Sequence, residues 1–234
     1  MDRFKAAADA AAEDVRGRGI GQLGEKMLHL MLKYYFAPDP ETHERPLGGF
    51  IADAVTGEGV IEVQTRGLSR LKPKLSAFLP LCPVTVVHPV TVTRHIRRFD
   101  ENGVQLSYRK SPKHESVYTA MREVYTLRDF LLHENLRICL CDVETDDLVV
   151  DNGRQRKRAD RIPIHFGESR MLHSPADYAA LLPILPEPFT VRDLMDTVCA
   201  PEMYVRIFLS TLIRVGAAAE CGKNGRMKAY RRLL

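Results

Sequence analysis

The strongest candidate for chemistry is a pair of carboxylates in a predicted hairpin. Asp53 lies in one apolar strand, residues 50–55, and Glu62 and Gln64 lie in the next, residues 60–65, with a glycine-containing turn between them. Glycine supplies the positive φ that a tight turn requires, and side chains alternate along a strand, so Glu62 and Gln64 point to one face. A carboxylate among apolar residues is costly without compensation. We therefore expect the two carboxylates to share a cation.

A hard divalent cation at Asp53 and Glu62 would suit phosphodiester hydrolysis. Such a cation polarises the phosphate and turns bound water into a nucleophile. Mg²⁺ prefers oxygen ligands and keeps several waters, so one or two carboxylates suffice. The expected cofactor is Mg²⁺ or Mn²⁺, with the Val63 carbonyl completing the protein's share. Glu25 is expected to bind a second ion or to orient a water, and Gln64 can orient a water without carrying charge.

The order and spacing of these residues resemble the PD-(D/E)xK, or restriction-endonuclease-like, superfamily, which includes Holliday-junction resolvases. The resemblance covers about residues 18–92 and implies a core of a helix, three strands, a helix and a strand. It implies catalytic roles for the following four residues: Glu25, Asp53, Glu62 and Gln64. In this resemblance Asp53 matches the family's aspartate and Glu62 the acidic member of the D/E-x-K element.

Gln64 departs from the family pattern, which usually has lysine at that position. Some restriction enzymes of this fold use glutamine there, so the substitution allows activity. It also leaves a slow or inactive enzyme open. Lys72 and Lys74, on a helix predicted over residues 68–79, could supply the missing charge or could be solvated helix residues.

An ordinary hairpin is the alternative to a metal site. In that interpretation Asp53 caps the turn, and Glu62 pairs with Arg66 or Arg70 on a solvated face of the sheet. Antiparallel sheets with one solvated face do alternate apolar and polar residues. The sequence alone leaves both interpretations open.

Length and composition favour one globular core, or one core with a small second domain. The chain has 234 residues, 45% of them hydrophobic, and 34 basic against 30 acidic residues give a formal charge of +4. This balance mildly favours nucleic acid over acidic partners. The five cysteines have no framework spacing and predict free thiols. No apolar stretch approaches the roughly 20 residues that span a bilayer, so we expect a cytoplasmic protein without membrane contact.

The first domain is expected to cover residues 1–175, with the minimal core at 18–92 and an extension at 93–175. Predicted helices and strands alternate along it. Helices are expected at 6–15, 21–36, 68–79, 92–99 and 115–133, strands at 84–90, 103–108, 136–143 and 148–150, a loop at 38–46 and an acidic turn at 144–147.

A basic run follows the last of these strands. Arg154, Arg156, Lys157, Arg158 and Arg161 are expected to form a loop, and Arg156, Lys157 and Arg158 are candidates for contact with nucleic acid. Such runs are usually solvated segments, and that interpretation stays open.

The C-terminal segment, residues 176–234, resembles a winged helix domain. Helices are predicted over 191–198 and 202–215, Gly216 ends the second helix, and two strands around a turn at 222–225 would form the wing. In DNA-binding members the second helix enters the major groove. The resemblance makes four basic residues candidates for contact with nucleic acid: Arg206, Arg214, Lys223 and Arg226. Because the second helix is apolar on more than one side, docking to protein stays open.

Together these features predict an α/β (α+β) fold with a mixed β-sheet flanked by helices, restriction endonuclease-like, plus a small winged helix-turn-helix domain. The expected function is metal-dependent hydrolysis of nucleic acid, with DNA favoured over RNA. Two alternatives are a catalytically inactive DNA-binding or regulatory protein and an adaptor whose winged helix docks protein. The resemblance is compatible with a homodimer.

Overall fold

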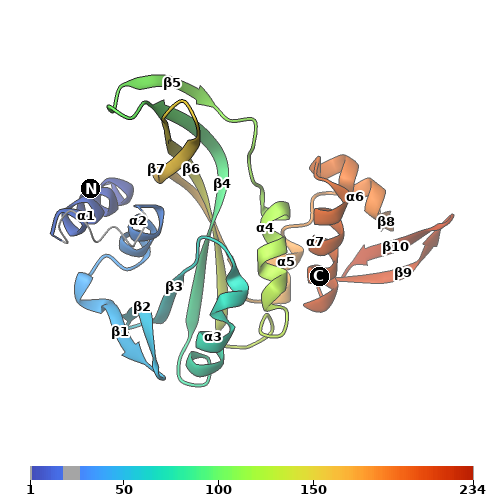
Figure 1. The fold of residues 1–234 in the computed structure, drawn as a ribbon. Helices are drawn as coiled ribbons and strands as arrows, with labels where there is room; N and C mark the ends of the chain where they lie inside the picture. The colour runs from blue at the N-terminus through green and yellow to red at the C-terminus, as the bar shows by residue number, and fades with distance from the viewer. Residues whose placement is uncertain (1, 18–26, 234) are drawn as a thin grey trace.

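The computed structural model describes residues 2–17 and 27–233, and one mixed β-sheet forms its centre (Figure 1). The strand order is β1-β2-β3-β4-β6-β7, and β5 pairs with the outer part of β4. The first three strands are antiparallel, β3, β4 and β6 are parallel, and β7 is antiparallel to β6. The strands are β1 (His43–Leu47), β2 (Phe50–Thr56), β3 (Gly59–Val63), β4 (Val84–Phe99), β5 (Gln105–Lys110), β6 (Leu136–Asp151) and β7 (Arg156–Leu172).

Helices cover both faces of this sheet, as Figure 1 shows. On one face α1 (Arg3–Gly17) and α2 (Met27–Phe36) pack against Val63, Val87 and Cys139. The other face carries further helices and short 3₁₀ turns, namely η2 (Leu68–Leu71), α3 (Lys72–Phe78), α4 (Val117–Val124), η3 (Tyr125–Leu127) and α5 (Pro175–Ala179). The prediction of a mixed sheet flanked by helices is confirmed.

Strands β4, β6 and β7 continue beyond the helices as a curved extension (Figure 1). We call its residues, 93–110 and 144–163, the arm. The helix predicted over 92–99 is wrong, because these residues form the second half of β4 and pair with β5 and β6. The acidic turn predicted at 144–147 is also wrong, since β6 runs through it without a break. Register irregularities lie on β4 near Val92 and at several points on β7.

Other predicted boundaries shift. The expected loop at 38–46 contains the turn η1 (Pro40–Thr42) and most of β1. The helix expected over 115–133 is reduced to α4 and η3, because 128–135 turn without helical pairing. The described part of the helix expected over 21–36 begins at Met27.

The C-terminal segment contains the two helices and the hairpin that the sequence predicts. Its elements are β8 (Phe189–Thr190), α6 (Val191–Val198), α7 (Glu202–Arg214), β9 (Ala218–Asn224) and β10 (Met227–Arg232). The hairpin turn lies at Gly225 and Arg226 rather than at 222–225. The segment shares one hydrophobic cluster with α3, α4 and the sheet, and Tyr118 of α4 meets Phe208 of α7 edge-on at 5.1 Å.

None of the helices formed by residues 2–17 and 27–233 is long and apolar enough to span a membrane.

Candidate active site

The β2–β3 hairpin brings Asp53 and Glu62 together. The register pairs Ala54 with Ile61, which places Asp53 opposite Glu62. Both side chains line one cavity of about 300 Å³ between α2 and α3. Gly59 holds the hairpin against β4, since its φ is 120° and a Cβ would lie 2.2 Å from the Pro83 carbonyl oxygen. The carboxylates therefore meet at one site, as the metal-site prediction requires.

Backbone amides of the hairpin bind both carboxylates. The Val63 N–H donates to Asp53 Oδ2 at 2.8 Å, and the Asp53 N–H donates to Glu62 Oε1 at 3.2 Å. These bonds fix each carboxylate relative to the opposite strand. Neither side chain serves as a cap for the turn in these contacts, which run across the strands instead.

Lys74 of α3 is the partner of Glu62. The Glu62 residue is only 1% exposed, and Lys74 Nζ donates to its Oε1 at 3.0 Å and to its Oε2 at 2.9 Å. The alternative in which Glu62 lies on a solvated face beside Arg66 or Arg70 is wrong. The interpretation of Lys74 as a solvated helix residue is wrong as well, because this cation reaches the buried carboxylate.

His29 completes the described part of the site, and sequence reasoning missed it. It lies on α2, and its Nε2 is 3.2 Å from Asp53 Oδ2. The one available signal was local: His29 is a polar residue in a mainly apolar helix. No spacing rule connects it with an aspartate 24 positions later.

The electrostatics of the two carboxylates differ. Burial, together with the negative charge of Asp53, raises the pKa of Glu62 to about 7 against the opposing effect of Lys74. Burial acts upward on Asp53 too, but the hydrogen bond and charge of His29, the Val63 amide and the charge of Lys74 hold the pKa of Asp53 below its ordinary value. Two carboxylates in one cavity repel each other, which is the situation that a bound cation relieves.

Gln64 lies at the edge of the same cavity with its groups engaged by backbone. The Gln64 side-chain amide donates to the Arg66 backbone carbonyl at 2.6 Å. The backbone carbonyl oxygen of Gln64 lies 2.7 Å from His88 Nδ1. Its N–H donates to the Val87 carbonyl at 2.9 Å, so β3 stays attached to β4 at this point. Position 64 is therefore held rigidly beside the carboxylates.

The donor set fits a cation that keeps most of its water. Among residues 2–17 and 27–233, no three or more His, Cys, Asp or Glu side chains are grouped so that they could hold a metal ion. The protein offers two carboxylates in an open cavity, which is the share that Mg²⁺ takes where waters and phosphate complete its shell. Glu25, predicted as a further ligand, lies outside the described residues.

The basic run predicted as a loop lies largely on a strand. Arg156, Lys157 and Arg158 belong to β7. Arg156 Nε is 2.9 Å from Asp151 Oδ2, and an Arg158 nitrogen is 3.6 Å from Asp147 Oδ2. The loop was predicted because the acidic partners, on β6, cannot be recognised from the run itself.

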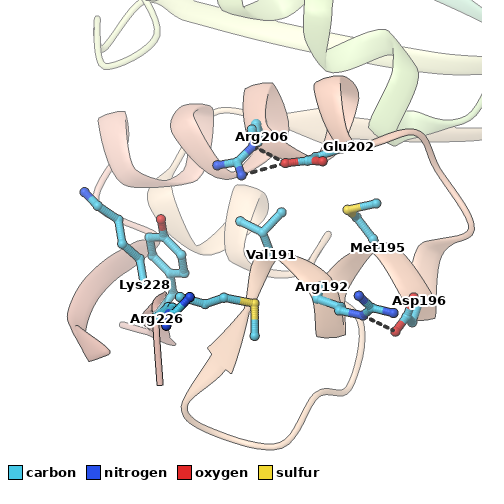
Figure 2. Close-up of a pocket in the computed structure, with 10 residues that line it drawn as sticks. Val191, Arg192, Met195, Asp196, Glu202, Arg206, Arg226 and Lys228 are labelled. Atoms are coloured by element: carbon cyan, nitrogen blue, oxygen red, sulfur yellow. Dashed lines mark hydrogen bonds and ion pairs between the residues drawn. The ribbon is translucent and has the colours of Figure 1, made fainter. Parts of the chain in front are cut away.

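Two of the four basic candidates of the C-terminal segment, Arg206 and Arg226, line a second, larger cavity. It measures about 580 Å³ and lies between α6, α7 and β10 (Figure 2). Arg206 Nε donates to Glu202 at 2.7 Å, and Figure 2 shows this pair with Arg226 across the cavity. Arg214 instead reaches the Arg128 carbonyl at 3.3 Å, and Lys223 is exposed on β9.

Comparison with known proteins identifies a family. Residues 26–173 match a family described as a domain of unknown function (DUF8091), a span that contains the hairpin, Lys74 and the arm. The chain is 37% identical over 221 residues to an uncharacterized protein of Treponema pallidum (strain Nichols), covering 91% of this chain and 87% of that protein. No solved structure matches. Since the family match covers more than half of its length, the chain belongs to the DUF8091 family.

Proposed function

We propose that this protein is a metal-dependent nuclease that hydrolyses phosphodiester bonds in DNA. The observation that carries the proposal is the convergence of Asp53, Glu62 and Lys74 in one cavity. Two carboxylates can hold a hard cation, and a lysine beside them can stabilise negative charge on a phosphate. These are the groups that phosphodiester hydrolysis needs.

The order of elements supports a restriction-endonuclease-like core. Helix α2 is followed by β1, β2 and β3, then by α3 and β4, and β3 and β4 are parallel. The resemblance drawn from the sequence implies this order, with the aspartate on the second strand and the glutamate on the third. The helices and hairpin of residues 189–232 support the winged helix assignment in the same way.

Each residue then has a role that its contacts allow. Asp53 and Glu62 would hold Mg²⁺ or Mn²⁺, which would supply charge neutralisation and an acidified water. Lys74 would shift from Glu62 toward the phosphate as negative charge develops there. His29 holds the Asp53 carboxylate in place, and Gln64 keeps the end of β3 rigid.

A catalytically inactive DNA-binding protein is the second candidate. Two observations favour it. Lys74 already pairs with both oxygens of Glu62 without a metal ion, and the Gln64 side-chain amide donates to the Arg66 carbonyl. In that case the ion pair would be structural and the basic surfaces would provide the function.

Cleavage assays with carboxylate variants test the proposal. Supercoiled plasmid and a four-way junction are incubated with Mg²⁺ or Mn²⁺ and with the wild type, Asp53→Asn or Glu62→Gln. We expect metal-dependent cleavage that falls about 100-fold or more in both variants, because a catalytic cation contributes several kcal/mol. The matched control is Glu58→Gln, an exposed residue in the turn of the same hairpin.

Calorimetric titration with Mn²⁺ gives a readout independent of turnover. The wild type should bind and Asp53→Asn should not. Cleavage that survives both carboxylate variants would overturn the proposal. If the protein binds DNA but neither cleaves it nor binds Mn²⁺, the second candidate is established. If it shows no DNA binding, no cleavage and no Mn²⁺ binding, the protein adaptor is favoured.

A further inference from the structure

The arm carries a cationic surface that the candidate active site does not use. Side chains alternate along β6, so Asp147 and Asp151 lie on the face of Val143, which packs with α1 and α2. The registers with β4, β5 and β7 place arginines beside them on that face. We call this set the arginine face: Arg94, Arg98, Arg109, Arg156, Arg158 and Arg161.

The two faces of the arm differ in charge. On the arginine face six arginines stand against two aspartates, Asp147 and Asp151, which leaves a formal +4 among its strand residues. On the opposite face Arg97, Lys110 and Lys157 are balanced by the acidic side chains of Glu144, Asp146 and Asp160. The excess positive charge is thus confined to one side of a two-sided sheet.

Asp147 is shared among three guanidinium groups. Arg161 binds it at 2.6 Å and 3.0 Å, while nitrogens of Arg158 and Arg94 lie at 3.6 Å and 3.8 Å. Guanidinium donors therefore outnumber the carboxylate oxygens available to them, and phosphate is an acceptor whose geometry they match.

The arginine face lies beyond the edge of the sheet at which the candidate site opens. Strand β3 ends at Val63, which pairs with Val87, and the parallel strand β4 continues to Phe99. Arg94 follows Val87 by seven residues, which is at most about 23 Å at 3.3 Å per residue because the strand is curved. About seven base pairs span that distance at 3.4 Å each.

We propose that the arginine face binds the phosphodiester backbone of DNA, further along the same molecule than the bond held at Asp53 and Glu62. The inference rests on the proposed function for the identity of the ligand. It assigns the positioning of substrate to the arm and leaves the chemistry to the hairpin. Because phosphate contacts carry no base information, this surface would bind DNA without preference for sequence.

Neighbouring residues on opposite faces provide the matched variants for a test. Arg109 and Lys110 are adjacent on β5, and Lys157 and Arg158 are adjacent on β7, and all four are exposed. The double variants R109Q/R158Q and K110Q/K157Q therefore change the same strands and the same net charge. Circular dichroism confirms that each is folded.

Binding of a fluorescein-labelled 30-base-pair duplex is measured by anisotropy in EDTA between 50 and 300 mM salt. Each phosphate contact contributes about −0.9 to the slope of log affinity against log salt. We expect R109Q/R158Q to weaken binding and to flatten the slope by about 2, and K110Q/K157Q to leave the slope nearly unchanged. Equal slopes for the two variants, or no binding of the wild type at low salt, would overturn the inference.

The assay separates this inference from the proposed catalysis. EDTA removes the cation, so the binding result does not depend on turnover. If the wild type shows no metal-dependent cleavage but the slope still depends selectively on the arginine face, only the proposed nuclease activity is contradicted. Intact cleavage with equal slopes for the two double variants would count against the arm alone.

Discussion

Lys74 Nζ donates to both oxygens of Glu62, at 3.0 Å and 2.9 Å, from a helix 12 positions further along the chain. The hairpin has glutamine at position 64, where the proposed restriction-endonuclease-like core would usually have lysine. A cation therefore reaches the carboxylate from α3 instead of from β3.

Lys74→Met should weaken both stability and cleavage. It leaves the buried Glu62 carboxylate without its lysine partner, and removing one partner of a buried ion pair costs about 3–5 kcal/mol. Urea unfolding at pH 8 measures this loss. Cleavage should fall about 100-fold if the lysine also stabilises charge on the phosphate. Lys72→Met is the control. Lys72 lies on the same helix, but its Nζ makes only a long contact of 4.0 Å, with Asp129 Oδ2.

Gln64→Lys should preserve or raise metal-dependent cleavage, because it adds a cation at the position that the superfamily uses. In a Lys74→Met background the same change should restore part of the lost activity, which a purely structural Lys74 would not allow. Gln64→Ala should lower cleavage, since the hydrogen bond to the Arg66 carbonyl is lost. Indifference to all three changes would place position 64 outside the chemistry.

Asp147→Asn should destabilise the protein by about 2 kcal/mol at pH 7, because hydrogen bonds to charged groups contribute about 1.5–3 kcal/mol. Burial acts upward on its pKa, yet the bond and charge of Arg161 and the charges of Arg158 and Arg94 hold it below the ordinary 3.8. The stabilisation is therefore present above pH 4 and is lost as pH falls through the folded-state pKa. Urea unfolding from pH 7 to pH 3 should show the gap between variant and wild type closing.

The control for Asp147 is Glu101→Gln, an exposed carboxylate in the turn between β4 and β5. It should show no gap at any pH. A constant gap for Asp147→Asn across the whole range would mean that its effect is one of packing rather than charge.

Lys223→Gln with Arg226→Gln should flatten the salt dependence of DNA binding by about 2 if the wing contacts phosphate. Preference among DNA sequences should stay nearly unchanged. Anisotropy titrations of duplex DNA measure both quantities. Lys5→Gln with Arg16→Gln removes two exposed charges from α1 and should leave the slope unchanged. A null result for the wing pair, with binding intact, would favour protein docking by the C-terminal segment.

The sequence predicts the local elements of the fold better than its arm. Alternation and glycine identify the hairpin, and apolar spacing identifies α7, since both signals lie within a few residues. Residues 92–99 give a misleading local signal, because Val92, Ile96 and Phe99 have helical spacing and three arginines lie between them. Their acidic partners on β6 are about fifty positions away, and Arg97 meets Asp146 only in the folded sheet. Pairing at such separation leaves no local pattern.

The candidate site, like the fold, was predictable only where its signal is local in the sequence. The type and order of Asp53 and Glu62 indicated shared chemistry, and the structure places them together. The contributions of His29 and Lys74 come from helices on opposite sides of the hairpin, so only the tertiary packing of α2 and α3 selects them. The choice between Lys72 and Lys74 likewise depends on the orientation of α3.

A single strand of 16 residues, β4, pairs with β3 over Val84–Val87 and then continues to the tip of the arm. If both regions engage one DNA molecule, this strand acts as a molecular ruler, because its length sets the separation between the cleaved bond and the anchored phosphates. Substrates too short to span that separation would reach one region but not both.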